Sequence, residues 1–270
     1  MPYVEVETGV RIFVEDLNPS GEHTVLFIHG WPANHQMFEY QFNQLPKYGI
    51  RCMAMDIRGF GKSSKPWEGY SYDDLADDVN CVIETLGLDN ITLVGFSVGG
   101  AIAVRYMSRY EGCGVGKLAL ASAAVPVFTQ RPDYPYSLPA EEVNKLICQT
   151  YTDRPKMLSE FGKKFFASKV SPQFLNWFSA LGLEASGHAT ARLAKSLRDE
   201  DLRRDICQIT VPTTIFHGIH DQVVAFANAE ITHQNIRRSR LIPFECSGHG
   251  LVYDEADKFN YCLTQFVCMS

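Results

Sequence analysis

The segment Gly95-Phe96-Ser97-Val98-Gly99 constrains this chain more than any other, because of what flanks it. It follows an apolar, strand-like run at 91–94 and leads directly into small and apolar residues typical of a helix start. A strand that turns at once into a helix has room only for small residues two places before and after the serine, and both are glycine. The pattern therefore predicts a tight turn that exposes the Ser97 hydroxyl at a helix N-terminus, where backbone N–H groups favour developing negative charge.

Short apolar runs recur along the chain and alternate with helix-like segments. Two runs near the N-terminus alternate with polar residues around Thr8-Gly9, which predicts an antiparallel hairpin. Later runs are short and mostly apolar, as suits parallel strands buried on both faces; they lie at 25–28, 52–55, 91–94, 117–120 and 213–216, and a last strand-like run lies at 240–244. Amphipathic spacing predicts helices between them, most clearly at 72–86, where Ser71 is the N-cap, and at 256–267. We therefore expect an α/β fold with a mostly parallel central sheet.

The stretch 126–205 breaks this alternation. It contains no strand-like run, but it is rich in proline and in aromatic residues such as Phe128 and Trp177. Its length far exceeds that of a usual connection between parallel strands. We expect an α/β core formed by 1–125 and 206–270, with 126–205 inserted as a helical cap that roofs the site and supplies an apolar wall. Ordinary crossover helices are the alternative.

Composition argues against several partners and locations. The net charge is −6 at pH 7 and no basic stripe is visible, so we expect no nucleic acid and no anionic membrane surface as partner. No apolar run reaches 18 residues, and the first residues lack the basic and apolar regions of a signal peptide, which favours a cytoplasmic protein. The eight cysteines form no CxxC pair, so reduced, mostly buried thiols are expected rather than a disulfide framework.

A serine nucleophile needs a base to accept its proton and an acid to orient that base. His249 is the best-placed histidine, because it follows the last strand-like run and precedes the closing helix, at the carboxyl ends of the strands. We expect His29, at the end of another strand, to brace its own loop. Four other histidines are interpreted as surface or packing residues: His23, His35, His188 and His233.

The acid is expected at Asp221, which also follows a strand-like run. The other place for an acid is the loop after the strand ending at Leu120, and Ala121-Ser122-Ala123-Ala124 holds no carboxylate. Asp254 and Glu255 are interpreted as first-turn helix residues. The resulting chain order of serine, aspartate and histidine is the order found in α/β-hydrolases and differs from those of the chymotrypsin and subtilisin types.

Acyl transfer also needs donors for an oxyanion. The N–H of Val98, directly after the nucleophile, is one candidate, and the N–H of Trp31 in His29-Gly30-Trp31-Pro32 is the other. A simple packing role is the alternative for Trp31. Pro32 fixes its own φ and restricts Trp31, so we expect it to hold the Trp31 carbonyl toward the site.

With these residues in place, the chain resembles the α/β-hydrolase fold family over essentially its whole length, and within it the cofactor-free haloperoxidase and aryl-esterase group. The matching segments are 29–32, 56–64, 94–100, 122–126, 221–224 and 248–250. The resemblance implies Ser97 as nucleophile, His249 as base, Asp221 as its orienter, and Trp31 and Val98 as oxyanion donors, without any cofactor.

The resemblance also implies a small-molecule ester as substrate and an acyl-enzyme, which hydrogen peroxide captures in perhydrolase-like members of the group. We expect the substrate to contact four side chains: Phe96, Phe128, Trp177 and Val224. Hydrolysis of lactones, lactams or other amides on the same three residues is the nearest alternative. Dehalogenases and epoxide hydrolases share the fold, but they use aspartate where this chain has a serine.

Two functions of other classes are less consistent with the sequence. A metal-dependent hydrolase would use His217, His220, Asp221 and His249, but this set lacks a recognised ligand spacing and leaves Ser97 without a role. A non-catalytic ligand receptor would be favoured only if one of the catalytic or oxyanion residues were missing, and none is. Gly61-Lys62-Ser63 hints at a phosphate loop, but Asp56 stands where that motif needs its first glycine.

Overall fold

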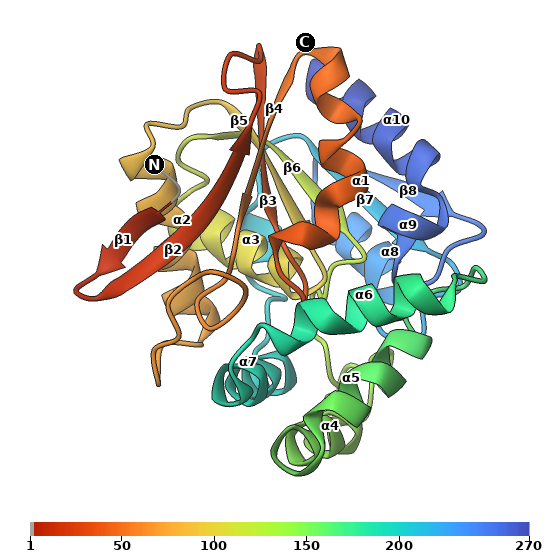
Figure 1. Ribbon diagram of the computed structural model, residues 1–270. Coiled ribbons are helices and arrows are strands. Elements are labelled where there is room, and N and C mark those ends of the chain that lie inside the picture. The colour runs from red at the N-terminus through yellow and green to blue at the C-terminus, as the bar shows by residue number, and fades with distance from the viewer. Residues whose placement is uncertain (1–2, 270) are drawn as a thin grey trace.

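The computed structural model describes residues 3–269, which form one eight-stranded sheet flanked by helices (Figure 1). The strands are β1 (Tyr3–Glu7), β2 (Val10–Leu17), β3 (His23–Ile28), β4 (Ile50–Met55), β5 (Ile91–Phe96), β6 (Val115–Ala121), β7 (Thr213–Gly218) and β8 (Ser239–Phe244). They lie in the order β1-β2-β4-β3-β5-β6-β7-β8. β2 runs antiparallel to β1 and β4, and the other neighbouring pairs are parallel. The predicted α/β fold, with its antiparallel N-terminal hairpin, is confirmed.

Helices cover both faces of the sheet. They are α1 (Glu39–Phe42), α2 (Tyr72–Thr85), α3 (Val98–Arg109), α4 (Ala140–Thr152), α5 (Arg154–Lys163), α6 (Pro172–Leu183), α7 (Gly187–Asp199), α8 (Phe226–Asn235), α9 (Leu251–Asp254) and α10 (Ala256–Cys268). Short 3-10 turns occur at His35–Phe38, Leu45–Tyr48 and Ile206–Gln208. Helix α2 begins with the expected capping box between Ser71 and Asp74.

Each buried strand contributes to two hydrophobic cores, because successive side chains point to opposite faces. On β3, Leu26 and Ile28 belong to the core that includes α2 and α3, whereas Val25 and Phe27 belong to the core that includes α10. All four side chains are fully buried. This double burial explains why the parallel strands read as continuous apolar runs rather than as alternating ones.

Helices α4 to α7 follow β6 and lie together beyond one end of the sheet, at the bottom of Figure 1. The two ends of this insertion meet, since the N–H of Leu202 donates to the carbonyl of Pro126 at 2.9 Å. Two further bonds fix the insertion over the carboxyl ends of the strands: Trp31 Nε1 donates to the Thr190 carbonyl at 2.9 Å, and the N–H of Gly250 donates to the Phe165 carbonyl at 2.7 Å. The division into core and cap as separate domains stays a prediction.

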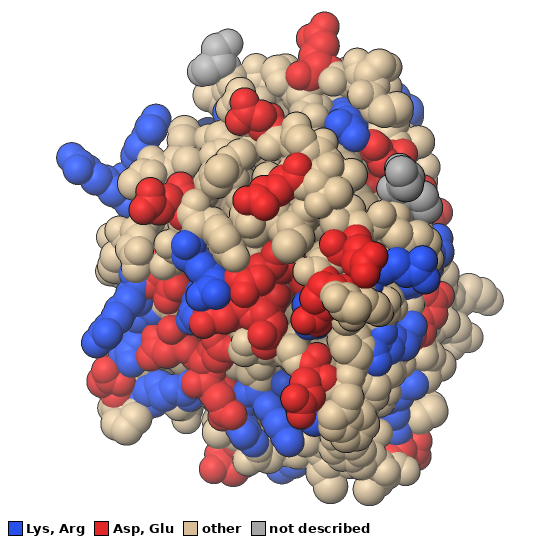
Figure 2. Space-filling view, turned by 90° about the vertical axis from the view of Figure 1, so that its left-hand side faces the viewer, with Lys and Arg blue, Asp and Glu red and all other residues tan. Residues whose placement is uncertain are grey.

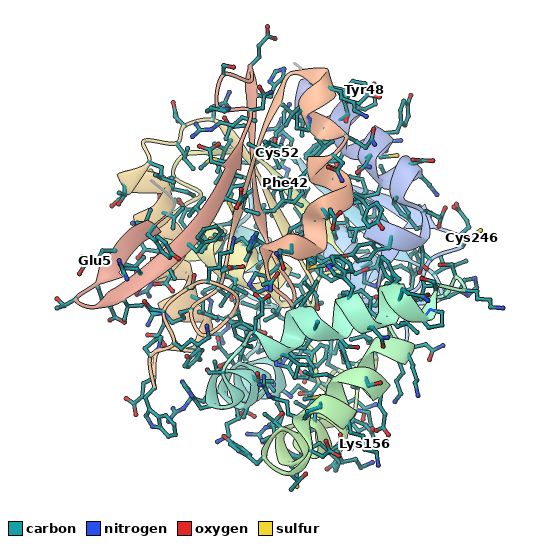
Figure 3. All side chains as sticks on the ribbon, viewed as in Figure 1. Glu5, Phe42, Tyr48, Cys52, Lys156 and Cys246 are labelled. Atoms are coloured by element: carbon teal, nitrogen blue, oxygen red, sulfur yellow. The ribbon has the colours of Figure 1, made fainter. Side chains whose placement is uncertain are left out.

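The cysteines do not have the expected burial. All eight are free, but only Cys52 is buried, Cys81 and Cys262 are half-buried, and the other five are exposed. Cys52 lies within the sheet, whereas Cys246 lies on an outer loop (Figure 3). The prediction of mostly buried thiols is therefore wrong, because the exposed cysteines lie in loops, in a 3-10 turn or on the outer faces of helices.

Acidic and basic side chains are intermingled on the face of the molecule shown in Figure 2. Ion pairs link α2 to α3; for example, Arg109 lies 2.6 Å from Asp77. Exposed pairs of this kind contribute little to stability. Within residues 3–269, no helix is both long and apolar enough to cross a membrane.

Candidate active site

Ser97 lies at the turn between β5 and α3 with a positive φ of 53° and ψ of −118°. Such a backbone is unfavourable for serine, and bonds on both sides hold it: the Ser97 N–H donates to the Ala121 carbonyl at 3.0 Å, and the Ala124 N–H donates to the Ser97 carbonyl at 2.9 Å. A Cβ atom at Gly95 or Gly99 would overlap neighbouring backbone atoms. The predicted tight turn is therefore present, and its two glycines are needed for close backbone approach.

Asp221 and His249 form a buried hydrogen-bonded pair. Nδ1 of His249 lies 2.8 Å from Oδ2 of Asp221, and Oδ1 of Asp221 accepts the N–H groups of Val223 and Val224, both at 2.8 Å. Burial alone would raise the pKa of Asp221. The charge interaction with His249 and hydrogen bonds from His217 and His249 outweigh burial and hold this pKa well below its usual range.

The ionised carboxylate fixes the tautomer of His249. Because a carboxylate can only accept, Nδ1 of the imidazole carries the proton, and in the neutral ring Nε2 presents the lone pair. Nε2 is buried and has no hydrogen-bond partner within residues 3–269, so it is not bonded to Ser97. An unpaired, buried imidazole nitrogen is costly unless a ligand or a reacting proton uses it.

Three backbone hydrogen bonds each join the first residue after one strand to a residue of the neighbouring strand. Strands β5, β6, β7 and β8 are neighbours in that order. The bonds run from the Ser97 N–H to the Ala121 carbonyl at 3.0 Å, from the Ser122 N–H to the Phe216 carbonyl at 2.8 Å, and from the Ile219 N–H to the Phe244 carbonyl at 3.0 Å. Backbone hydrogen bonds therefore contribute directly to the relative positions of the three loops.

The loop after β8 passes directly over the end of β7. A Cβ atom at Gly218 would overlap the carbonyl oxygens of Ser247 and Gly248, and the His220 N–H donates to the Ser247 carbonyl at 3.0 Å. This path brings His249 back toward the turn that carries Ser97, where the His249 ring centre lies 5.1 Å from that of Phe96.

The two expected oxyanion donors have unused N–H groups. Neither the backbone N–H of Trp31 nor that of Val98 has a protein acceptor within residues 3–269, and the Trp31 carbonyl likewise has no protein donor there. The Trp31 ring is fixed by its bond to Thr190 and by an edge-on contact with Phe161, with ring centres 5.1 Å apart. His29 braces the loop before Trp31 as expected, because its Nε2 accepts the Ile57 N–H at 3.0 Å.

Sequence reasoning considered His217 only as a metal ligand and missed its contact with Asp221. Nε2 of His217 lies 2.9 Å from the Val224 carbonyl and 3.3 Å from Oδ2 of Asp221. Since a carbonyl oxygen only accepts, this nitrogen carries a proton and points it at both oxygens. The available signal was a histidine at the end of a buried strand, four residues before the acid.

Asp254 and Glu255 lie where α9 meets α10, and both accept hydrogen bonds from the loop that carries His249. Glu255 accepts the Cys246 N–H at 2.9 Å and the Ser247 hydroxyl at 2.7 Å, and Asp254 accepts the Gly248 N–H at 2.9 Å. The interpretation of these two acids as first-turn residues therefore omitted their main contacts, which hold the loop that carries His249.

Comparison with known proteins identifies the family of this chain. A model described as the alpha/beta hydrolase fold matches residues 23–256. The chain belongs to the α/β-hydrolase fold family. It is 50% identical to the AB hydrolase superfamily protein YisY of Bacillus subtilis (strain 168), over 98% of each chain. It is 32% identical to a bifunctional esterase/perhydrolase of Acinetobacter calcoaceticus, over 99% of each. Among solved structures, an esterase from Exiguobacterium antarcticum matches with a TM-score of 0.96 and 47% identity, over 99% of each chain.

In this α/β-hydrolase, a pocket of about 220 Å³ opens between α4, α5 and the loop after β7. Its apolar lining consists of Phe128, Leu138, Leu146, Met157, Phe161 and Val223. Its polar lining consists of Glu142, Lys145, Gln149, Glu160, Lys164 and Gln222. Phe161 also contacts Trp31, so this side chain stands between the pocket and the expected oxyanion donor.

The four expected substrate contacts lie in different places. Phe128 lines the pocket, and Phe96 packs against His249. Val224 is buried, and its carbonyl is bonded to His217. Trp177 lies on α6 beside Phe174 and Tyr253, with ring centres 5.3 and 6.2 Å away, and it is not part of the pocket lining.

Proposed function

We propose that this protein is a serine hydrolase that cleaves carboxylic esters of small molecules through an acyl-enzyme. The observation that carries the proposal is His249, whose Nδ1 is bonded to buried Asp221 while its buried Nε2 has no partner within residues 3–269. This base lies at the same edge of the sheet as a serine held at positive φ. The name of the Exiguobacterium esterase and the name of the Acinetobacter esterase/perhydrolase support the same chemistry.

The chemistry follows from these positions. Oγ of Ser97 attacks the ester carbonyl carbon and passes its proton to Nε2 of His249, while the oxyanion accepts the N–H groups of Trp31 and Val98. His249 then returns the proton to the leaving alcohol, and the acyl group stays on the serine. A water molecule, activated by the same base, releases the carboxylic acid. Asp221 stays ionised and stabilises the imidazolium that forms twice in each turnover.

Perhydrolysis is a second candidate, and the unbonded Trp31 carbonyl favours it. If hydrogen peroxide replaces water, the acyl-enzyme yields a peracid, and a carbonyl directed at the site can accept a hydrogen bond from the attacking peroxide. The Trp31 N–H and carbonyl belong to different peptide groups, so both can act in one turnover. Pro32 restricts Trp31 in the way this arrangement requires.

A chain-length series of p-nitrophenyl esters, with and without peroxide, tests both reactions. We expect ester hydrolysis by the wild type and a loss on the order of 10³-fold or more in kcat for Ser97→Ala, with folding unchanged. A fluorophosphonate should add to the wild type at Ser97 and abolish its activity. Full activity in the labelled fraction, or in Ser97→Ala, would contradict the proposal.

A further inference from the structure

The carboxylate of Asp254 joins two segments that are far apart in the sequence. Its Oδ2 accepts the N–H of Gly248 and the N–H of Ala167, both at 2.9 Å. Its Oδ1 accepts the N–H of Ser168 at 3.0 Å and also the Ser168 hydroxyl. One oxygen therefore bonds both to the loop that carries His249 and to the segment 165–168 that follows α5.

A second bond ties the same two segments together on the other side of His249. The N–H of Gly250 donates to the Phe165 carbonyl at 2.7 Å. The Phe165 ring is buried and meets the His249 imidazole edge-on, with ring centres 4.9 Å apart and an interplanar angle of 89°. Gly250 is thus bonded to the segment 165–168 directly and Gly248 is linked to it through Asp254, while Phe165 of the same segment packs against the imidazole.

We propose that Asp254 is a positioning residue, which fastens the segment 165–168 to the His249 loop and so fixes the imidazole against Phe165. The carboxylate suits this task because all of its partners are N–H or O–H donors, and an ionised carboxylate only accepts. An asparagine has a single acceptor oxygen, and its NH₂ group would face N–H donors. Asp254→Asn should therefore lose the bonds made by one of the two oxygens.

The effect on catalysis rests on the function proposed above. A small displacement of a catalytic group can lower kcat strongly while it changes the free energy of unfolding little. The reason is that the reacting atoms must lie within about half an ångström of their productive geometry. Release of the segment 165–168 would uncover the imidazole and widen its range of orientations. We expect kcat to fall about tenfold or more in Asp254→Asn, with KM changed less than about twofold.

Asp257 provides a matched control. It lies three residues further along, in the first turn of α10, is exposed, and its side chain makes no hydrogen bond or ion pair within residues 3–269. Asp257→Asn removes the same charge close to the same loop and should leave kcat and KM unchanged. Ser168→Ala is a milder variant, because it removes one donor to Asp254 and keeps the backbone bonds.

The experiment combines steady-state kinetics with amide hydrogen exchange of the full-length protein. In Asp254→Asn, peptides that cover 165–168 and 246–250 should both exchange about tenfold faster or more, while β5 and β7 stay protected. Ser168→Ala should change both segments in the same direction by less. If only one segment exchanges faster, or if kcat is unchanged although both do, the positioning role is wrong. Exchange is measured without substrate, so a chain that cleaves no ester would overturn the proposed function and leave the link between the segments testable.

Discussion

Nε2 of His217 lies 3.3 Å from Oδ2 of Asp221, the same carboxylate oxygen that His249 approaches at 2.8 Å. Two imidazoles therefore serve one buried acid. His249 contacts the acid through Nδ1 and has an unpaired Nε2, whereas His217 is buried and contacts the acid through its Nε2. Asp221 is kept ionised by this surplus of donors, which offsets the penalty of burial.

The role of His217 can be tested with His217→Phe, which keeps an aromatic ring and removes the donor. A hydrogen bond to a charged group contributes roughly 1.5–3 kcal/mol. If the bond from His217 serves mainly to orient Asp221, its loss raises the activation barrier by a similar amount, and kcat should fall about tenfold or more. The exposed neighbour His220 gives the control His220→Phe, which should retain wild-type kcat. Equal kcat values for the two variants would assign His217 a packing role alone.

Asp221→Asn should reduce kcat by roughly 10⁴-fold through the wrong imidazole tautomer. The asparagine oxygen can still accept the N–H groups of Val223 and Val224, which turns its NH₂ group toward Nδ1 of His249. Nδ1 must then accept, the proton moves to Nε2, and the base is lost. Kinetics with Asp257→Asn as a comparison check this, and nuclear magnetic resonance of the imidazole protons identifies the tautomer. A variant that keeps the Nδ1–H form and loses activity would require another explanation.

Pro32→Leu should lower the ratio of perhydrolysis to ester hydrolysis by about tenfold, the equivalent of one hydrogen bond of ~1–2 kcal/mol. The physical reason is the Trp31 carbonyl, which has no protein partner within residues 3–269 and is free to accept from peroxide. Phe128→Ala is the contrasting variant, because Phe128 lines the apolar pocket. It should shift the preferred acyl-chain length and leave the ratio unchanged. Peracid formation and ester hydrolysis, measured side by side, decide whether the two effects separate.

Stability should fall as the pH drops from about 6.5 to about 4, in part because of His29. Burial lowers the pKa of His29 from 6.5 to about 4, although nearby Asp56 acts in the opposite direction. Between these two pH values the unfolded chain binds a proton that the folded chain does not, so each step toward acid favours unfolding. The resulting loss of stability is absent above about pH 6.5 and reaches roughly 3 kcal/mol at pH 4.

Urea unfolding of the wild type and of His29→Gln at pH 7, 5.5 and 4.5 measures this contribution. The glutamine amide oxygen can accept the Ile57 N–H in place of Nε2, and this side chain does not titrate, so the stability of the variant should decline less steeply toward acid. Parallel declines in the two proteins would show that His29 is not the titrating group.

Periodicity and motif spacing were sufficient to predict most of this fold. Double burial makes the parallel strands continuous apolar runs, and the strand-to-helix turn requires small residues around Ser97, so both leave local patterns. Contacts between distant segments leave none. Asp254 and Ala167 are 87 positions apart, and an acid near the start of a helix looks the same whether or not it bonds to another segment. The interpretation of Asp254 as a first-turn helix residue therefore missed the bonds that it makes to the distant segment.

The exposed cysteines illustrate the same limit. Cys148 lies on α4 and Cys268 ends α10, where the amphipathic pattern places polar residues outward, but cysteine is classed as apolar and was assigned to the interior. A thiol is small enough to stand on either side of a helix at little cost. Only the positions of the neighbouring elements decide which side it occupies.

The close approach at Gly218 has a consequence for the spacing of the proposed nucleophile and base. β5 and β8 are three strands apart, which at about 4.8 Å per strand separates their ends by roughly 14 Å. Because a proton passes directly only between atoms in hydrogen-bond contact, the chain that leaves β8 must return across the intervening strand ends. Gly218 is the point where it crosses, and a methyl group there would push the crossing chain outward. The absence of a side chain at Gly218 thus allows the loop from β8 to cross close to the sheet and to carry His249 toward Ser97, although β7 itself carries neither of these two residues.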